Sequence, residues 1–118
     1  SAMSAPQVLF VSARESDIDP IVEVLGRRGI VATRAASWPE AFSTLRAGTG
    51  VRILAIDADS PTLVEAVAIA EVSRRYPEVR VITLADDPTG VDDAGIVLHR
   101  SPRPGWVAAQ LLMFGEFA

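Results

Sequence analysis

The sequence contains no cysteine and only one histidine, His99. A disulfide framework and a thiolate metal site are therefore excluded, and no second imidazole is present to complete a zinc site. The absence of cysteine also fits a reducing compartment, so we expect a cytoplasmic protein. A single histidine near the end of an apolar run is more often a packing or loop residue than a base, and we assign it no role.

Long apolar runs and massed positive charge are also missing. No segment approaches the ~20 apolar residues of a membrane-spanning helix, and no charged-then-apolar leader is present. The net charge is −4, and the arginines are scattered along the chain, as at 27–28, 74–75, Arg100 and Arg103. This distribution predicts that the domain binds neither nucleic acid nor a membrane.

The length and composition predict one globular domain. The chain has 118 residues, of which 49% are hydrophobic and 22% charged, and these values are ordinary for a single folded unit. Ser1 and Ala2 before Met3 resemble a cloning remnant. We therefore set residues 1–3 aside as tag remnant and start, and expect residues 4–118 to form the domain.

Short apolar runs alternate with helical patterns along the chain. A nearly continuous apolar run is typical of a strand that is buried on both faces. Four such runs are Val8–Val11, Ile53–Ile56, Val79–Leu84 and Ile96–Leu98. A weaker run, Ile30–Thr33, continues into Arg34 and Ala35 and suits an edge strand.

Apolar residues spaced three and four apart predict the helices. The patterns are Ile18-Ile21-Val22-Leu25, Trp38-Ala41-Phe42-Leu45, a segment from Ser60 to about Tyr76, and a segment from Gly105 onward. Gly29 follows the first pattern, where a left-handed cap is expected. Ser37 and Glu40 form a capping box for the second, and Pro77 ends the third.

This order of elements predicts an α/β fold in three layers. Strands that alternate with helices form a parallel sheet with right-handed crossovers and helices on both faces, and five strands commonly take the order 2-1-3-4-5. Only residues 86–95 separate the last two strands. A helix between them, the fourth in such a fold, is therefore expected to be shortened or absent.

The carboxyl ends of strands one and three are expected to form the functional crevice, which places the loops 12–17 and 57–61 together. Charged residues at this edge are Arg14, Glu15, Asp17, Asp57, Asp59, Asp86, Asp87 and Arg100. Carboxylates here suit a Mg²⁺ or phosphoryl site, although aspartate also favours turns and helix caps. Asp57 stands out because it directly follows the buried run Ile53–Ile56.

The segment 52–61 resembles the third strand of response-regulator receiver (CheY-like) domains, which have a flavodoxin-like fold. In that family an aspartate ends the strand, accepts a phosphoryl group and is followed four residues later by proline. Asp57 and Pro61 match both positions. The resemblance covers essentially the whole chain in element order. It implies a two-component signalling domain, with Asp57 as the phosphoacceptor equivalent and proteins as partners.

The residues that hold Mg²⁺ and the phosphoryl group in that family are mostly replaced. Receivers end strand one with an acidic pair that binds Mg²⁺, whereas Ser12 and Ala13 stand there in this sequence. They end strand four with serine or threonine, whereas Ala85 aligns there and Thr83 comes two residues too early. The aromatic switch residue of strand five aligns with Val97.

The family's lysine aligns with Arg100, and its proline falls one residue late, at Pro102. A guanidinium stays protonated and forms two-pronged pairs with carboxylates, so Arg100 could pair with Asp57 permanently and occupy the acceptor. We therefore predict a crevice without bound metal, in which Asp57 is either paired with Arg100 or open to solvent. Its residues are Ser12, Glu15, Asp59, Ala85 and Arg100.

Three functional hypotheses follow. The first is an atypical receiver (pseudo-receiver) that acts by phosphorylation-independent protein–protein interaction, with no enzyme activity and no cofactor. The second is a weak but genuine receiver phosphorylated on Asp57, which would need Mg²⁺. The third is a flavodoxin-like module for a small ligand, although the loop 12–17 is acidic and lacks the glycines of a phosphate-binding loop.

The last helical segment carries two apolar stripes. Val107, Leu111 and Phe114 form one, which is expected to cover the sheet. Trp106, Met113 and Phe117 form the second, about a quarter turn away. We predict that this second stripe is the surface for a signalling protein or for a second copy, as the resemblance implies and as aromatic residues and methionine favour. The alternative is that it fills space left by the shortened fourth helix or packs against the first helix.

Overall fold

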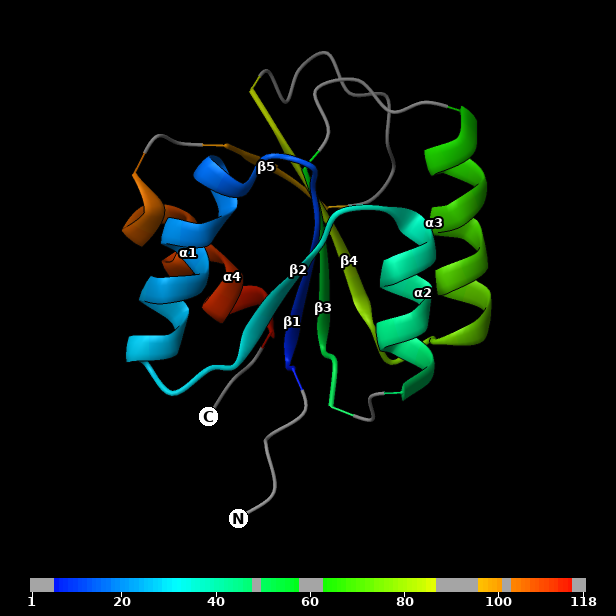
Figure 1. The fold of residues 1–118 in the computed structure, drawn as a ribbon, viewed down its shortest axis with the longest axis horizontal. Coiled ribbons are helices and arrows are strands. Elements are labelled where there is room, and N and C mark those ends of the chain that lie inside the picture. Colours follow the sequence, from blue (N-terminus) through cyan, green and yellow to red (C-terminus); the bar gives the residue numbers. More distant parts are fainter. Residues whose placement is uncertain (1–5, 48–49, 58–62, 87–95, 101–102, 116–118) are drawn as a thin grey trace.

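The computed structural model describes residues 6–47, 50–57, 63–86, 96–100 and 103–115. Its elements are β1 (Val8–Val11), α1 (Glu15–Arg27), β2 (Ala32–Ala35), α2 (Trp38–Ala47), β3 (Ile53–Asp57), α3 (Leu63–Arg75), β4 (Arg80–Ala85), β5 (Ile96–His99) and α4 (Pro104–Gly115). The five strands are parallel in the order β2-β1-β3-β4-β5 (Figure 1), which confirms the predicted sheet.

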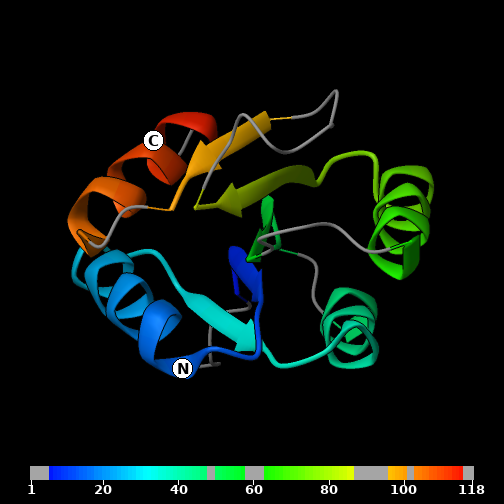
Figure 2. The same ribbon diagram turned by 90° about the horizontal axis from the view of Figure 1, so that it is seen from above.

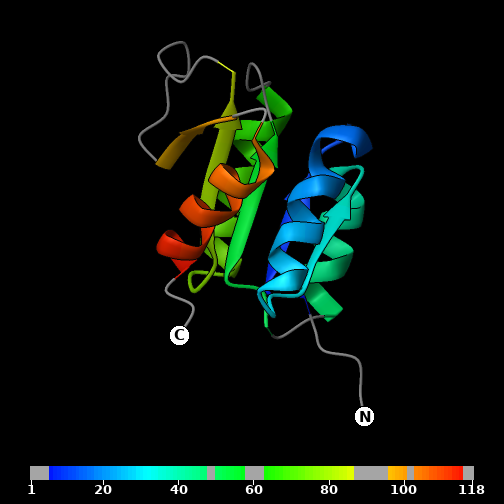
Figure 3. The same ribbon diagram turned by 90° about the vertical axis from the view of Figure 1, so that its left-hand side faces the viewer.

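The helices cover the sheet in pairs and divide the core into two halves. Helices α1 and α4 lie side by side on one face, and α2 and α3 lie on the other (Figures 2 and 3). In β1, Val8 and Phe10 pack toward the first pair, whereas Leu9 and Val11 pack toward the second. Burial on both faces explains why this strand is continuously apolar.

The second strand begins two residues later than the sequence pattern predicted. The backbone N–H of Ile30 donates to Leu25 O at 3.0 Å, and its side chain is buried against α1, so Ile30 belongs to the end of that helix. Gly29 before it has φ 81°, which confirms the left-handed cap. Sheet pairing starts where Ala32 faces Val8.

Among the described residues, no helix lies between β4 and β5. The expectation of a shortened or absent helix concerns residues 87–95, which lie outside the described part of the chain. The predicted start of the third helix at Ser60 also lies outside it. The other described element bounds follow the predicted patterns closely. Within the described ranges, no helix has both the length and the apolar character needed to cross a membrane.

Candidate functional site

Ser12 is fixed at the carboxyl end of β1 by four hydrogen bonds. Its backbone N–H donates to Ala35 O at 3.0 Å, and its carbonyl accepts from Arg34 Nη1 at 2.8 Å. Its hydroxyl accepts the backbone N–H of Arg14 at 3.0 Å and donates to Asp57 Oδ2 at 2.7 Å. The buried hydroxyl is thus committed to Asp57, the last residue of β3.

Arg100 follows β5, and its guanidinium binds three of the carboxylates that the structure describes. Its Nη1 lies 2.9 Å from Asp57 Oδ1 and donates to Asp17 Oδ2 at 3.2 Å. Its Nε and Nη2 donate to the two oxygens of Asp86, at 3.1 and 2.9 Å. The backbone N–H of Arg100 donates to Ala85 O at 2.8 Å, which fixes where the side chain starts. The expected pair between Arg100 and Asp57 is therefore present.

The Arg100–Asp57 pair is almost completely buried, with side-chain exposures of 8% and 2%. Within the described residues, no hydrogen bond of good geometry reaches Asp57 Oδ1, so the 2.9 Å contact is an ion pair without a well-aligned N–H. A buried carboxylate needs a compensating charge, and Arg100 supplies it. The one carboxylate oxygen without a hydrogen bond therefore faces a permanent cation.

The other predicted crevice residues are placed differently. Glu15 lies at the exposed start of α1, where it pairs with Arg34 Nη2 at 3.0 Å and does not touch Arg100. Ala85 ends β4, fully buried, and Thr83 is buried inside the same strand opposite Ile56. Asp59 lies outside the described residues.

The described residues around Asp57 do not form a set that fits Mg²⁺. Mg²⁺ demands an octahedral set of oxygen ligands and usually takes one or two carboxylates. In the described part of the chain, no group of three His, Cys, Asp or Glu side chains is placed to hold a metal. Asp17 and Asp86 bind the guanidinium of Arg100 instead.

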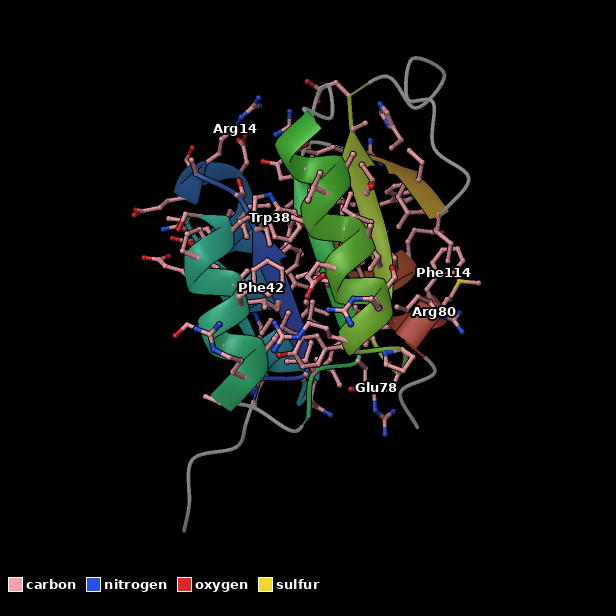
Figure 4. All side chains as sticks on the ribbon, turned by 90° about the vertical axis from the view of Figure 1, so that its right-hand side faces the viewer. Arg14, Trp38, Phe42, Glu78, Arg80 and Phe114 are labelled. Carbon is pink, nitrogen blue, oxygen red and sulfur yellow. The ribbon has the colours of Figure 1, made fainter. Side chains whose placement is uncertain are left out.

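A small pocket opens beside the Ser12–Asp57 hydrogen bond. Its volume is about 270 Å³, and its walls include Arg14, Trp38 and Glu65. Figure 4 shows Arg14 and Trp38 at the same end of the molecule, with Phe42 next along α2. The ring centroids of Trp38 and Phe42 are 6.0 Å apart, so the indole is held against its own helix.

The sequence did not reveal two features of this site. Asp17 and Asp86 were among the acids expected at this edge, but nothing in the sequence indicated that both bind Arg100. Nothing in the sequence indicated a role for Arg34, because its partners are distant in the sequence. They are the carbonyl of Ser12 in the loop after β1 and the carboxylate of Glu15 in α1.

The exposed side of α4 carries part of the second apolar stripe. Trp106 is 42% exposed and Met113 is 71% exposed, whereas Val107 and Leu111 are fully buried against the sheet. Phe117, the third member of the stripe, lies outside the described residues. The two described members are therefore on the surface and not in the core.

Comparison with known proteins identifies the fold. No protein-family model matches the sequence, and no curated protein matches it. A response regulator from Thermotoga maritima has a TM-score of 0.78 at 16% identity, covering 98% of this chain and 100% of that one. The signal receiver domain of an HD domain-containing protein from Pseudomonas fluorescens has a TM-score of 0.74 at 17% identity, covering 98% and 90%.

A protein from Burkholderia pseudomallei described as pilus assembly-related has a TM-score of 0.71 at 18% identity, covering 98% of this chain and 93% of that one. These likenesses show that the chain has the CheY-like fold of response-regulator receiver domains.

Proposed function

We propose that this chain is a pseudo-receiver, a cytoplasmic signal-transduction domain that acts through protein–protein contacts without phosphorylation of Asp57. The observation that carries the proposal is the buried ion pair between Arg100 and Asp57, 2.9 Å apart. Both oxygens of the acceptor carboxylate are engaged, one by this guanidinium and the other by the Ser12 hydroxyl.

The physical argument concerns charge. Phosphoryl transfer to a carboxylate gathers negative charge on the transferred group and the acceptor, and a metal ion normally neutralises it. Here the local cation is a guanidinium that three carboxylates already hold. Moving Arg100 aside would leave Asp57 buried and uncompensated, which is strongly unfavourable.

The proposed contact surface is the exposed side of α4. Trp106 and Met113 present aromatic and thioether groups to solvent on a helix whose other side fills the core. Exposed residues of these kinds are enriched in protein interfaces. We propose that a signalling protein or a second copy of the chain binds there.

The test is exposure of the purified protein to acetyl phosphate with Mg²⁺, followed by intact-mass spectrometry. The wild type should stay unmodified, and an Asp57→Asn variant gives the baseline. Stoichiometric addition of one phosphoryl group that disappears in this variant would instead support a genuine phosphoacceptor. A ligand-dependent rise in melting temperature with flavin mononucleotide would support a small-ligand module.

A further inference from the structure

Helix α1 begins without a side-chain cap of its own. The residue before it is Arg14, and a guanidinium has only donors, so it cannot accept the free N–H groups of the first turn. Accordingly, the side chain of Arg14 makes no capping hydrogen bond. The first turn instead carries Glu15 and Asp17, and each of these acids binds an arginine from another part of the fold. The start of α1 therefore depends on contacts from outside the helix.

Arg34 in β2 holds this segment on one side. Its Nη1 donates to the carbonyl of Ser12 at 2.8 Å, and its Nη2 donates to Glu15 at 3.0 Å. Its Nε lies 3.9 Å from a carboxylate oxygen of Asp19. The side chain of Arg34 is only 17% exposed. One largely buried guanidinium thus ties the loop after β1 to the start of α1.

Arg100 holds the same segment on the other side. Glu15 and Asp19 are four residues apart and share one side of the helix, whereas Asp17, two residues from each, points the other way. Arg100 Nη1 donates to Asp17 Oδ2 at 3.2 Å. Because β2 and β5 are the two edge strands of the sheet, the start of α1 is fastened from both edges.

Residues 13–17 are all exposed and lie between the buried residues Ser12 and Ile18. A segment with few buried contacts opens at a lower free energy than the core does. Exposed carboxylates such as that of Glu15 add little to stability through their ion pairs. Residues 12–17, which we call the strap, can therefore open while Ile18 and Ile21 stay packed in the core.

The strap contacts Asp57 through Ser12. The Ser12 hydroxyl donates to Asp57 Oδ2 at 2.7 Å, and the backbone N–H of Arg14 donates to the same hydroxyl at 3.0 Å. Opening of the strap would therefore remove one of the groups that surround this buried carboxylate.

Opening would cost the two arginines different contacts. Arg100 would lose Asp17 but keep Asp57 and Asp86. Arg34 would lose both of the side-chain hydrogen bonds that the structure describes for it. The closed strap therefore depends more on Arg34 than on Arg100.

We propose that the strap opens and closes over Asp57, and that Arg34 sets how often it opens. Arg34 is then a positioning residue, which acts on Asp57 through Ser12. The inference rests on the proposed function only in taking the closed crevice as the resting state. It makes the β2 edge of the sheet, and not only the β5 edge, a determinant of access to Asp57.

The test is amide hydrogen exchange of the isotope-labelled protein, followed by NMR. The amides of Arg14, Asp17 and Ile18 donate within the closed strap, to Ser12 Oγ and to Arg14 O. Arg34→Met should raise their exchange rates about tenfold or more, which corresponds to ~1.4 kcal/mol or more in the free energy of opening. Amides of β1 should exchange as in the wild type. The side-chain Nε–Hε resonance of Arg100 should also shift, because Asp17 leaves it more often.

Arg27→Met is the matched control. Arg27 pairs with Glu23 of α1 at 3.2 Å, so this change removes the same charge and one ion pair of the same helix, away from the strap. It should leave the exchange of the strap amides unchanged. Glu15→Gln is a milder second variant, because it removes one partner of Arg34 at an exposed position. It should fold and should raise the exchange of the same amides by a smaller factor.

Unchanged exchange of the strap amides in Arg34→Met would overturn the proposal, and so would an equal rise in Arg27→Met. A uniform rise that includes the amides of β1 would also overturn it, because Arg34 would then only stabilise the whole fold. If Arg34→Met does not fold, unchanged exchange in Glu15→Gln overturns the proposal. None of these results depends on a phosphodonor, so phosphorylation of the wild type would contradict the proposed function and leave the strap to be judged by exchange.

Discussion

Arg100 Nη1 lies 2.9 Å from Asp57 Oδ1 in a nearly solvent-free contact. Arg100 also binds Asp17 and Asp86, whereas Asp57, within the described part of the chain, has polar side-chain contacts with Arg100 and Ser12 alone. Arg100 therefore connects the charged residues of the crevice, and Asp57 is one of its ion-pair partners.

This inequality predicts different costs for removing the two partners. Arg100→Met keeps most of the side-chain volume but leaves the Asp57 carboxylate buried without a countercharge, and should lower the free energy of unfolding by ~3–5 kcal/mol. Asp57→Asn should cost clearly less, because the guanidinium keeps Asp17 and Asp86. Urea unfolding of both variants measures the difference. An equal or larger cost for Asp57→Asn would contradict it.

The double variant Asp57→Asn/Arg100→Met supplies the control for this comparison. Once Asp57 carries no charge, removing Arg100 no longer strands a buried ion. The double variant should therefore be more stable than the sum of the single effects implies, by ~0.5–3 kcal/mol. Strict additivity would mean that the pair contributes no coupling.

The hydrogen bond from Ser12 to Asp57 predicts a smaller but measurable effect. Ser12→Ala removes a buried donor to a charged group, and bonds of this kind contribute ~1.5–3 kcal/mol. Ser16→Ala is a matched control, because Ser16 is exposed in the first turn of α1 and its loss should change stability little. Thermal or urea unfolding checks both. A neutral Ser12→Ala variant would show that its hydroxyl is not needed to hold Asp57.

The crevice is also expected to bind no Mg²⁺ at millimolar concentration, because Arg100 holds the nearby carboxylates of Asp17 and Asp86. A variant with Ser12→Asp, Ala13→Asp and Arg100→Lys carries the acidic pair and the lysine that receiver domains have at these positions. It should bind Mg²⁺ more tightly than the wild type. Isothermal titration calorimetry compares the two. Tight Mg²⁺ binding by the wild type would show that another carboxylate serves as a ligand.

The exposed side of α4 predicts a separable loss of interaction. Trp106→Glu with Met113→Glu should abolish self-association or partner capture in sedimentation and pull-down experiments, while the melting temperature changes little. Val67→Glu is the matched control, because Val67 is 64% exposed on α3, on the other face of the sheet. Equal effects of both changes, or unfolding of the α4 variant, would argue against an interface on this helix.

The sequence predicted the sheet because its strongest signals are local. Continuous apolar runs such as Ile53–Ile56 reflect burial on both faces, and Gly29 marks a left-handed cap that a helix end requires. The start of β2 was misplaced, because Ile30 is apolar for a different reason: it packs against α1. An apolar pattern reports burial and does not distinguish the end of a helix from the start of a strand.

The candidate site was predicted only in part, because its contacts join distant segments. The resemblance placed Arg100 beside Asp57, but the binding of Asp17 and Asp86 to the same guanidinium depends on side-chain directions at three separate elements. Likewise, the arginines are scattered in the sequence, yet the parallel topology brings seven of them, at helix ends and at the starts of the following strands, to the edge of the sheet opposite the crevice. A one-dimensional count of charge cannot show this.

The central claim is that Arg100 pairs with Asp57 and thereby prevents a metal ion and a phosphoryl group from binding there. The most direct test follows the side-chain Nε–Hε resonance of Arg100 by NMR while beryllofluoride and Mg²⁺ are added, with Arg100→Lys used to assign the signal. The account predicts that the resonance and the backbone amides of Ser12 and Asp57 stay unshifted. Saturable shifts of these signals, absent in Asp57→Asn, would show that the acceptor is open and that the chain is a phosphoacceptor.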